Sequence, residues 1–225
     1  MNGTNSQTLS QQELRLRALL DAILPHATFD GWSAKTVRLA AREAGLSPGD
    51  VALTCPRGEI DLLAYWSKTL DDVAAGEITT LDLGQMKIRD RVTSAVLSRL
   101  TALAPHEEAA RRARARLLLP DAAKTGTELV WATSDMIWRA IGDTSTDGNF
   151  YSKRTILSAV YTATLASWLS EDDPEKVKAR GFLDRRIADV MTFEKSKAQF
   201  HKMTGDLPDV AQMLGTLRYG KGPQI

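Results

Sequence analysis

The segment Asp143 to Arg154, DTSTDGNFYSKR, places acidic and hydroxyl side chains at the spacing of a calcium-binding loop. Asp143, Ser145 and Asp147 stand at alternate positions and Gly148 follows, as in the first half of an EF-hand loop. The twelfth position of such a loop carries a glutamate that binds the ion through both oxygens, but here that position is Arg154. Because a cation there repels calcium, the sequence predicts no metal site in this loop.

The other residue types that support catalysis are scattered. The histidines His26, His106 and His201 lie far apart, and none has the Glu-x-x-His or His-x-x-x-His spacing that helices use for metal ligands. The single cysteine, Cys55, excludes an internal disulfide and has no cation nearer in sequence than Arg57 to activate its thiol. No Gly-x-Ser-x-Gly elbow, phosphate-binding loop or dinucleotide fingerprint is present. The sequence therefore predicts a protein that is not an enzyme and has no cofactor.

Composition indicates a globular protein without a strong charge. The chain has 225 residues, is 43% hydrophobic, and carries 29 basic and 28 acidic side chains for a formal charge of +1. It has no global positive field to attract nucleic acid or anionic lipid. No apolar run is long enough to span a bilayer, and the start, MNGTNSQTLSQQ, has neither the basic nor the apolar region of a targeting peptide. We expect a cytoplasmic protein without a signal or transit peptide.

The elements that must position these residues are helices. Apolar residues recur at three- and four-residue spacing almost throughout, whereas alternation typical of strands is scarce. The pattern predicts an all-α fold of about eight to ten helices. The first ends near Pro25, and Ser33 and Ser47 cap the next two. The remaining expected helices cover residues 60–75, 87–103, 107–119, 129–141, 156–169 and 175–202, with a short amphipathic segment after Gly205.

The segment AREAGLSPGDVAL (residues 41–53) has the tight glycine turn of a helix-turn-helix and resembles the N-terminal head of the TetR superfamily. Its second helix carries Asp50 and aliphatic residues where DNA readers carry cations and amides, so that only Thr54 and Arg57 are suited to DNA. We therefore expect the architecture without nucleic-acid binding. The predicted organisation is a disordered tail (1–11), a helix-turn-helix head (12–66), a larger helical body (67–203) and the amphipathic segment (204–225).

The body resembles a more specific family. DMIWRAIGDTSTDGNFYSKRTILSAVYTATLASWL (residues 135–169) and FLDRRIADVMTFEK (residues 182–195) are similar to the accessory protein numbered nine of coenzyme Q (ubiquinone) biosynthesis. The resemblance extends from about Leu14 to Lys202. It implies a TetR-like homodimer without enzymatic activity that binds isoprenoid lipid or a ubiquinone precursor and delivers it to the di-iron demethoxyubiquinone hydroxylase. It also implies peripheral contact with the bacterial inner membrane.

The resemblance also assigns residues to a partner-binding patch and a membrane segment. Phe150 stands where mitochondrial members are expected to carry tryptophan. Replacing Tyr151 by alanine or Arg154 by glutamate is expected to abolish hydroxylase binding and leave folding intact. The patch comprises Trp138, Gly142, Asp143, Asp147, Phe150, Tyr151 and Arg154. The membrane-associating residues are Leu207, Val210, Met213, Leu214 and Leu217.

Physical reasoning from the residues leaves alternatives beside this assignment. Aromatic and arginine side chains on a polar loop suit an interface, but Phe150 and Tyr151 also suit the core cap of the following helix. The arginine run 111–116 suits a solvated face with ion pairs, or contact with anionic lipid headgroups. Apolar helices 129–141 and 156–169 fit a filled core as well as a lipid cavity. The residues predicted to line such a cavity are Met86, Val92, Val96, Met136, Val160 and Leu165.

Two functions follow from these expectations. The first is a non-enzymatic lipid-binding accessory protein of ubiquinone biosynthesis. The rival is a TetR-like, ligand-responsive transcriptional regulator, which would share the head and the pocket but bind DNA in a salt-dependent way.

Overall fold

The computed structural model describes residues 10–146 and 148–204, and within these ranges it contains nine α-helices, one short 3-10 helix and no strand. This confirms the all-α prediction. The predicted patch residue Asp147 and the predicted membrane residues Leu207, Val210, Met213, Leu214 and Leu217 lie outside the described residues. The helices are α1 (Gln11–Asp30), α2 (Ala34–Glu43), α3 (Pro48–Thr54), α4 (Glu59–Thr79), α5 (Ile88–Thr101), α6 (Glu107–Leu117), α7 (Ala123–Ala140), α8 (Gly148–Ser170) and α9 (Val177–Thr204).

The helix-turn-helix forms where its capping residues predict it. Ser33 begins α2 and Ser47 begins α3, and each serine hydroxyl accepts a hydrogen bond from the backbone N–H three residues later. Between the helices Gly45 adopts φ +67°, a left-handed conformation that glycine reaches without steric cost. The sequence-level signals for this motif are therefore confirmed.

The expected end of the first helix at Pro25 is wrong, because α1 continues through Pro25 to Asp30. Proline removes one backbone hydrogen bond in a helix interior. The packing of the residues on either side of Pro25 offsets this loss, since Ile23 and Ala27 are fully buried. Tertiary burial of the helix thus outweighs the local preference of one residue.

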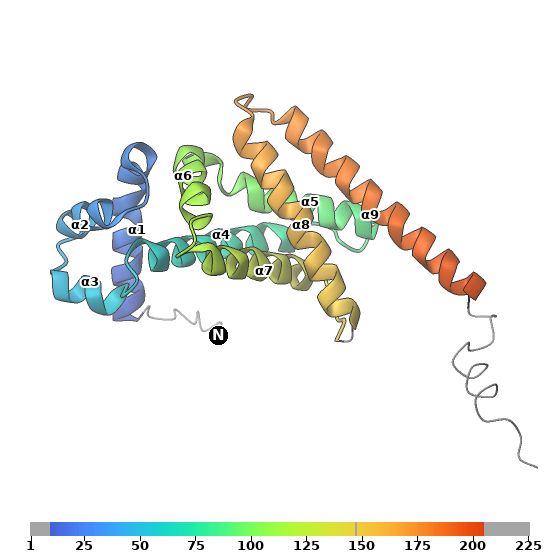
Figure 1. Ribbon diagram of the computed structural model, residues 1–225, viewed down its shortest axis with the longest axis horizontal. Coiled ribbons are helices and arrows are strands. Elements are labelled where there is room, and N and C mark those ends of the chain that lie inside the picture. The colour runs from blue at the N-terminus through green and yellow to red at the C-terminus, as the bar shows by residue number, and fades with distance from the viewer. Residues whose placement is uncertain (1–9, 147, 205–225) are drawn as a thin grey trace, which may run out of the picture. The chain divides into compact units, whose positions relative to one another are not determined.

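The head and the body pack together within one compact unit, which ends at Asp184, and a second unit begins at Arg185. Helices α1, α2 and α3 contact one another, and α1 also contacts α4 and α6 (Figure 1). Trp32, next to α2, donates its indole N–H to the carbonyl of Ala109 in α6 at 3.0 Å and stacks on Trp66 of α4. The predicted boundary between residues 66 and 67 stays a prediction.

The body is built around paired helices. Helix α4 packs beside α5 and α7, and α7 packs beside α8 (Figure 1). Helix α6 contacts α7 and α8 and so links the head to the body. Among the described residues, no helix is both long and apolar enough to cross a bilayer.

Candidate functional site: an apolar pocket and an aromatic corner

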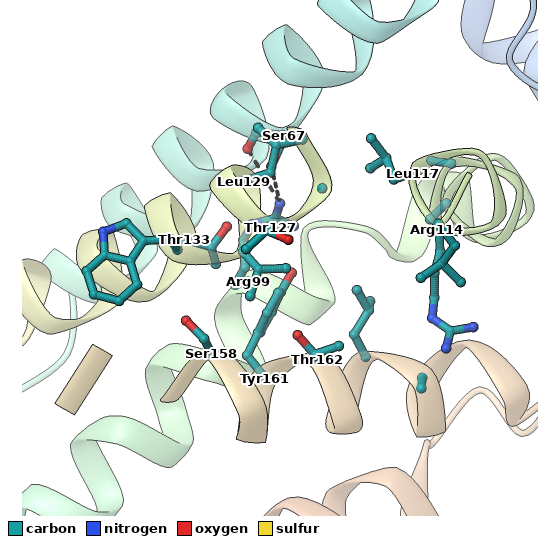
Figure 2. Close-up of a pocket in the computed structure, with 18 of the residues that line it drawn as sticks. Ser67, Arg99, Arg114, Leu117, Thr127, Leu129, Thr133, Ser158, Tyr161 and Thr162 are labelled. Carbon is teal, nitrogen blue, oxygen red and sulfur yellow. Dashed lines mark hydrogen bonds between the residues drawn. The ribbon is translucent and has the colours of Figure 1, made fainter. Parts of the chain in front are cut away.

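The body contains a pocket of about 780 Å³ between α4, α5, α6, α7 and α8 (Figure 2). This is the size range of sites that bind small organic ligands. Most of the lining side chains are aliphatic or small. They include Leu63, Leu70, Leu103, Ala110, Ala113, Leu117, Leu118, Ala123, Gly126, Leu129, Val130, Ala159, Ala163, Leu165, Ala166 and Leu169.

One wall of the pocket, on α8, consists mostly of small residues. On α8 the small lining residues recur at three- and four-residue spacing, so they share one face. That face carries Thr155, Ser158, Ala159, Thr162, Ala163 and Ala166. Of the large side chains of α8, Tyr161, Leu165 and Leu169 also line the pocket, whereas Leu157 and Trp168 are buried away from it. Small side chains cannot fill the space between the helix axes, and a void results.

Of the six residues predicted to line a lipid cavity, Leu165 lines this pocket and the other five do not. Val92, Val96 and Val160 are buried in packed regions, and Met86 and Met136 are half-buried outside the pocket. The prediction selected large apolar side chains, which fill space. On α8, by contrast, most of the lining side chains are small.

The predicted partner-binding patch is organised around Arg154, which is 1% exposed. Its Nε donates to Asp135 at 2.6 Å, and its Nη1 donates to Asp143 and to the carbonyl of Phe150, both at 3.2 Å. The guanidinium also lies 3.5 Å from the centre of the Phe150 ring. The structure therefore brings three of the predicted patch members together. A fourth, Trp138, donates its indole N–H to the carbonyl of the neighbouring Lys153 at 3.1 Å.

Gly142 positions Asp143 in this network. It follows α7 with φ +89°, and the backbone N–H groups of residues 142 and 143 donate to the carbonyls of Arg139 and Trp138. This is the Schellman arrangement that ends helices at a left-handed glycine. The polar loop thus leaves α7 in a fixed direction, with the Asp143 carboxylate over Arg154.

Tyr151 is an exposed aromatic member of the patch, with 64% of its surface accessible. Its ring stacks on Trp131 of α7 and contacts Phe150 edge-on. We call Trp131, Phe150 and Tyr151 the aromatic corner. Trp131 also lines the pocket, so the corner adjoins it. Arg154→Glu is now expected to impair folding, because a glutamate there would bury a third carboxylate beside Asp135 and Asp143.

Asp143 is ionised at neutral pH. Burial of its side chain opposes ionisation, but hydrogen bonds from Lys153, Ser145 and Arg154 outweigh it and lower the pKa of Asp143 to about 2. Its carboxylate pairs with two cations, Lys153 and Arg154, and the Nζ of Lys153 lies 2.7 Å from one carboxylate oxygen. Asp143 and Ser145, two of the residues that suggested a calcium loop, instead take part in an internal network of hydrogen bonds and ion pairs.

This pKa predicts an acid-sensitive contribution to stability. Because the folded-state pKa of Asp143 lies below the ordinary value of 3.8, the stabilisation is present above pH 3.8 and lost as the pH falls toward 2. Asp143→Asn is expected to be less stable than the wild type at neutral pH, with a difference that shrinks between about pH 4 and pH 2. Urea unfolding of both proteins across this range measures the difference; a gap that is independent of pH would contradict the assignment.

A second buried ion pair lies at the pocket. Arg99 of α5 is 3% exposed and donates to Asp71 of α4, which also accepts a hydrogen bond from Thr133 of α7 at 2.9 Å. Burial raises the pKa of Asp71, while the charge and hydrogen bond of Arg99 act in the opposite direction. Sequence reasoning missed this pair, because its two residues lie 28 positions apart on different helices.

The arginine run of α6 is mostly paired. Arg111 pairs with Glu108, Arg112 with Glu108, and Arg116 with Glu59 and Asp121. Arg114 is exposed and lines the pocket (Figure 2). Within the described part of the chain, Arg114 makes no ion pair, and no group of three or more histidine, cysteine or acidic side chains is arranged to hold a metal ion.

Cys55 is expected to react slowly with thiol reagents. It is 2% exposed, and burial, with the Asp61 charge, raises its pKa to about 11. At about pH 8 the native thiol should react with Ellman's reagent at least about 100-fold more slowly than in urea-unfolded protein, since the reacting species is the thiolate. Native and unfolded rates that agree within a few-fold would show that the thiol is accessible.

The fold and the pocket define the class: an all-α protein of TetR-like architecture with an apolar pocket in its body. A TetR transcriptional regulator from Nitrosomonas europaea superposes with a TM-score of 0.63 at 18% identity, over 77% of this chain and 95% of the regulator. At this identity the likeness concerns the fold alone.

The more specific resemblance is to the COQ9 family. The COQ9 family model matches residues 123–194, which span α7, α8 and the first part of α9. The chain is 28% identical to the ubiquinone biosynthesis protein COQ9 of Rattus norvegicus over 211 residues, 91% of this chain and 67% of the rat protein. It is 29% identical to the COQ9 of Homo sapiens over 203 residues, 88% of this chain and 63% of the human protein. Together with the fold, these findings support the predicted COQ9 family resemblance.

The matched relatives are longer proteins. The chain spans about two thirds of the length of the rat and human proteins. A probable COQ9 of Dictyostelium discoideum is 22% identical, and the match covers 86% of this chain and 64% of that protein. All three are named as mitochondrial.

Proposed function

We propose that this protein is a non-enzymatic accessory protein of ubiquinone biosynthesis, which binds isoprenoid quinone intermediates in its pocket. The observation that carries the proposal is the 780 Å³ apolar pocket inside the body. Burial of an isoprenoid tail there is favourable by about 25 cal/mol per Å² before the costs of association. The names of the COQ9 relatives supply the pathway.

The first test is the identity of any lipid that copurifies with the protein. Organic extraction of freshly purified protein followed by mass spectrometry is expected to recover a polyprenylated quinone or its precursor. The control is Ala159→Trp, a variant that places an indole in the pocket. It is purified in parallel, and its extract should lack that lipid. Extracts of the two proteins with the same lipid content would contradict binding in the pocket.

The second part of the proposal is presentation to a di-iron hydroxylase through the aromatic corner. Exposed aromatic side chains contribute large contact area at a low entropic cost, which is why they dominate many interfaces. Tyr151 is exposed, and the corner adjoins the pocket, so a partner docked there would be close to a bound lipid. Tyr151→Ala is therefore expected to lose binding to the hydroxylase.

Phe29→Ala is the matched control for the docking test, because Phe29 is an aromatic residue of the head that is 79% exposed. Pull-down of the hydroxylase by both variants, with folding monitored by circular dichroism, distinguishes the corner from any exposed aromatic. Equal retention by the two variants would contradict the docking site.

Homodimer formation and peripheral membrane contact through residues 207–217 belong to the same proposal. Light scattering measures the first, and liposome sedimentation measures the second.

The rival function, a ligand-responsive regulator, is disfavoured by the surface of α3. Thr54, one of two residues suited to DNA contact, is buried, and the other, Arg57, is paired with Asp61 at 2.7 Å. Asp50 pairs with Arg15, and the exposed side chain of Leu53 has no hydrogen-bonding group. We propose that the head does not bind DNA; salt-dependent retention on duplex DNA would favour the regulator instead.

A further inference from the structure

The pocket is apolar over most of its surface, but its inner wall carries a cation with an unused donor. Arg99 lines the pocket and is 3% exposed. Its Nε binds Asp71, and its Nη2 lies 3.3 Å from the Ser67 hydroxyl and 3.4 Å from the Ser67 carbonyl (Figure 2). Its Nη1 is buried and has no hydrogen-bond partner among the described residues. A buried guanidinium nitrogen without an acceptor is unfavourable, so the position favours an acceptor from outside the chain.

Tyr161 supplies a second donor at the same place. It is 3% exposed, lines the pocket from α8, and its ring points toward Arg99 (Figure 2). Burial raises the pKa of Tyr161, and the charge of Arg99 acts on it in the opposite direction, with Asp71 adding to the increase. The phenol is therefore neutral and able to donate. No hydrogen bond joins its hydroxyl to another described residue.

The neighbouring polar side chains are already paired, which limits the donors available to a ligand. The Thr133 hydroxyl donates to Asp71, and Ser158 shares a 3.0 Å hydrogen bond with Ser134. Since Asp71 already balances the charge of Arg99, a second carboxylate in the pocket would be repelled by Asp71. At the Arg99 end of the pocket the free donors thus suit an uncharged acceptor better than an anion, whereas the unpaired cation of the lining, Arg114, belongs to α6.

We propose that Arg99 Nη1 and the Tyr161 hydroxyl form a subsite for the head of the ligand, which accepts a neutral oxygen acceptor such as a ring carbonyl. The ligand's hydrocarbon tail then lies against the aliphatic and small side chains that make up most of the rest of the pocket. This inference rests on the proposed lipid-binding function and adds the chemical class and orientation of the ligand: a quinone-type ring directed toward α5, with its tail extending away.

The test compares two probes that share a tail and differ in the head. Binding of 2-decyl-1,4-benzoquinone and of decylbenzene to the full chain is measured by displacement of a fluorescent apolar dye. The wild type is expected to bind the benzoquinone at least about tenfold more tightly, because a site built to donate hydrogen bonds discriminates against a ligand without an acceptor. Tyr161→Phe is expected to reduce this preference several-fold while leaving decylbenzene affinity unchanged.

Two further variants keep the test decisive. Arg99→Met combined with Asp71→Asn removes the donor without leaving an unpaired buried carboxylate, and it should also lose the preference. Tyr65→Phe is the control, because Tyr65 lies on α4 outside the pocket lining. If the wild type binds both probes equally, or if folded Tyr161→Phe keeps the full preference, the head subsite is wrong and the lipid pocket stands. If neither probe binds, the proposed function fails as well.

Discussion

Replacing Arg154 by methionine is expected to lower the free energy of unfolding by about 3–5 kcal/mol, the usual effect of removing one partner from a buried ion pair. Arg154 is 1% exposed and binds both Asp135 and Asp143. Methionine keeps much of the side-chain volume but leaves Asp143, whose own side chain is 6% exposed, without one of its two cations. The loss is therefore expected from electrostatics and not from a cavity. Urea unfolding followed by circular dichroism at neutral pH measures it.

Arg139→Met is the control for this substitution, because Arg139 also pairs with Asp135, at 2.7 Å, but is 69% exposed. An exposed pair contributes about 0–1 kcal/mol, so this variant should be nearly as stable as the wild type. Similar losses in the two variants would show that burial does not strengthen the Arg154 network. The comparison also bears on docking: failure of an Arg154 variant to bind a partner would reflect a disordered corner and not a lost contact.

The position of Arg154 illustrates what the sequence alone could and could not predict. Helices and caps follow from local spacing, so α2, α3 and the loop after α7 were predictable from Ser33, Ser47 and Gly142. Burial of a charged side chain depends on which distant residues face it. Arg154 meets Asp135, and Arg99 meets Asp71, only after the helices pack, and no periodic pattern in one helix encodes that meeting.

The pocket was unpredictable for a related reason. Small residues at helical spacing, such as those on the lining face of α8, occur both where two helices pack closely and where they enclose a void. The difference lies in the distance between the helix axes, which the whole fold determines. Reasoning from the sequence therefore selected bulky apolar residues such as Val96, which is fully buried in the core. Only Leu165 among the six predicted residues lies at the boundary of the space.

Replacing Ala159 by tryptophan is expected to weaken binding of an isoprenoid quinone by at least about tenfold, or ~1.4 kcal/mol. Ala159 is exposed on the lining face of α8, so an indole there would occupy space that the ligand needs. Ala132→Trp is the control, because Ala132 is exposed on α7 and does not line the pocket. Dye displacement by 2-decyl-1,4-benzoquinone measures the affinity of both variants. Retained affinity in Ala159→Trp would place the ligand elsewhere.

The stability of the same variant tests whether the space is open. In a filled core, an alanine-to-tryptophan change overpacks the interior and costs typically about 1–3 kcal/mol. In an open pocket the indole enters space that is already present and buries apolar surface, so the melting temperature should stay the same or rise. A lower melting temperature together with lost binding would indicate a distorted body. Lost binding at unchanged stability is the combination that requires a ligand-sized void beside α8.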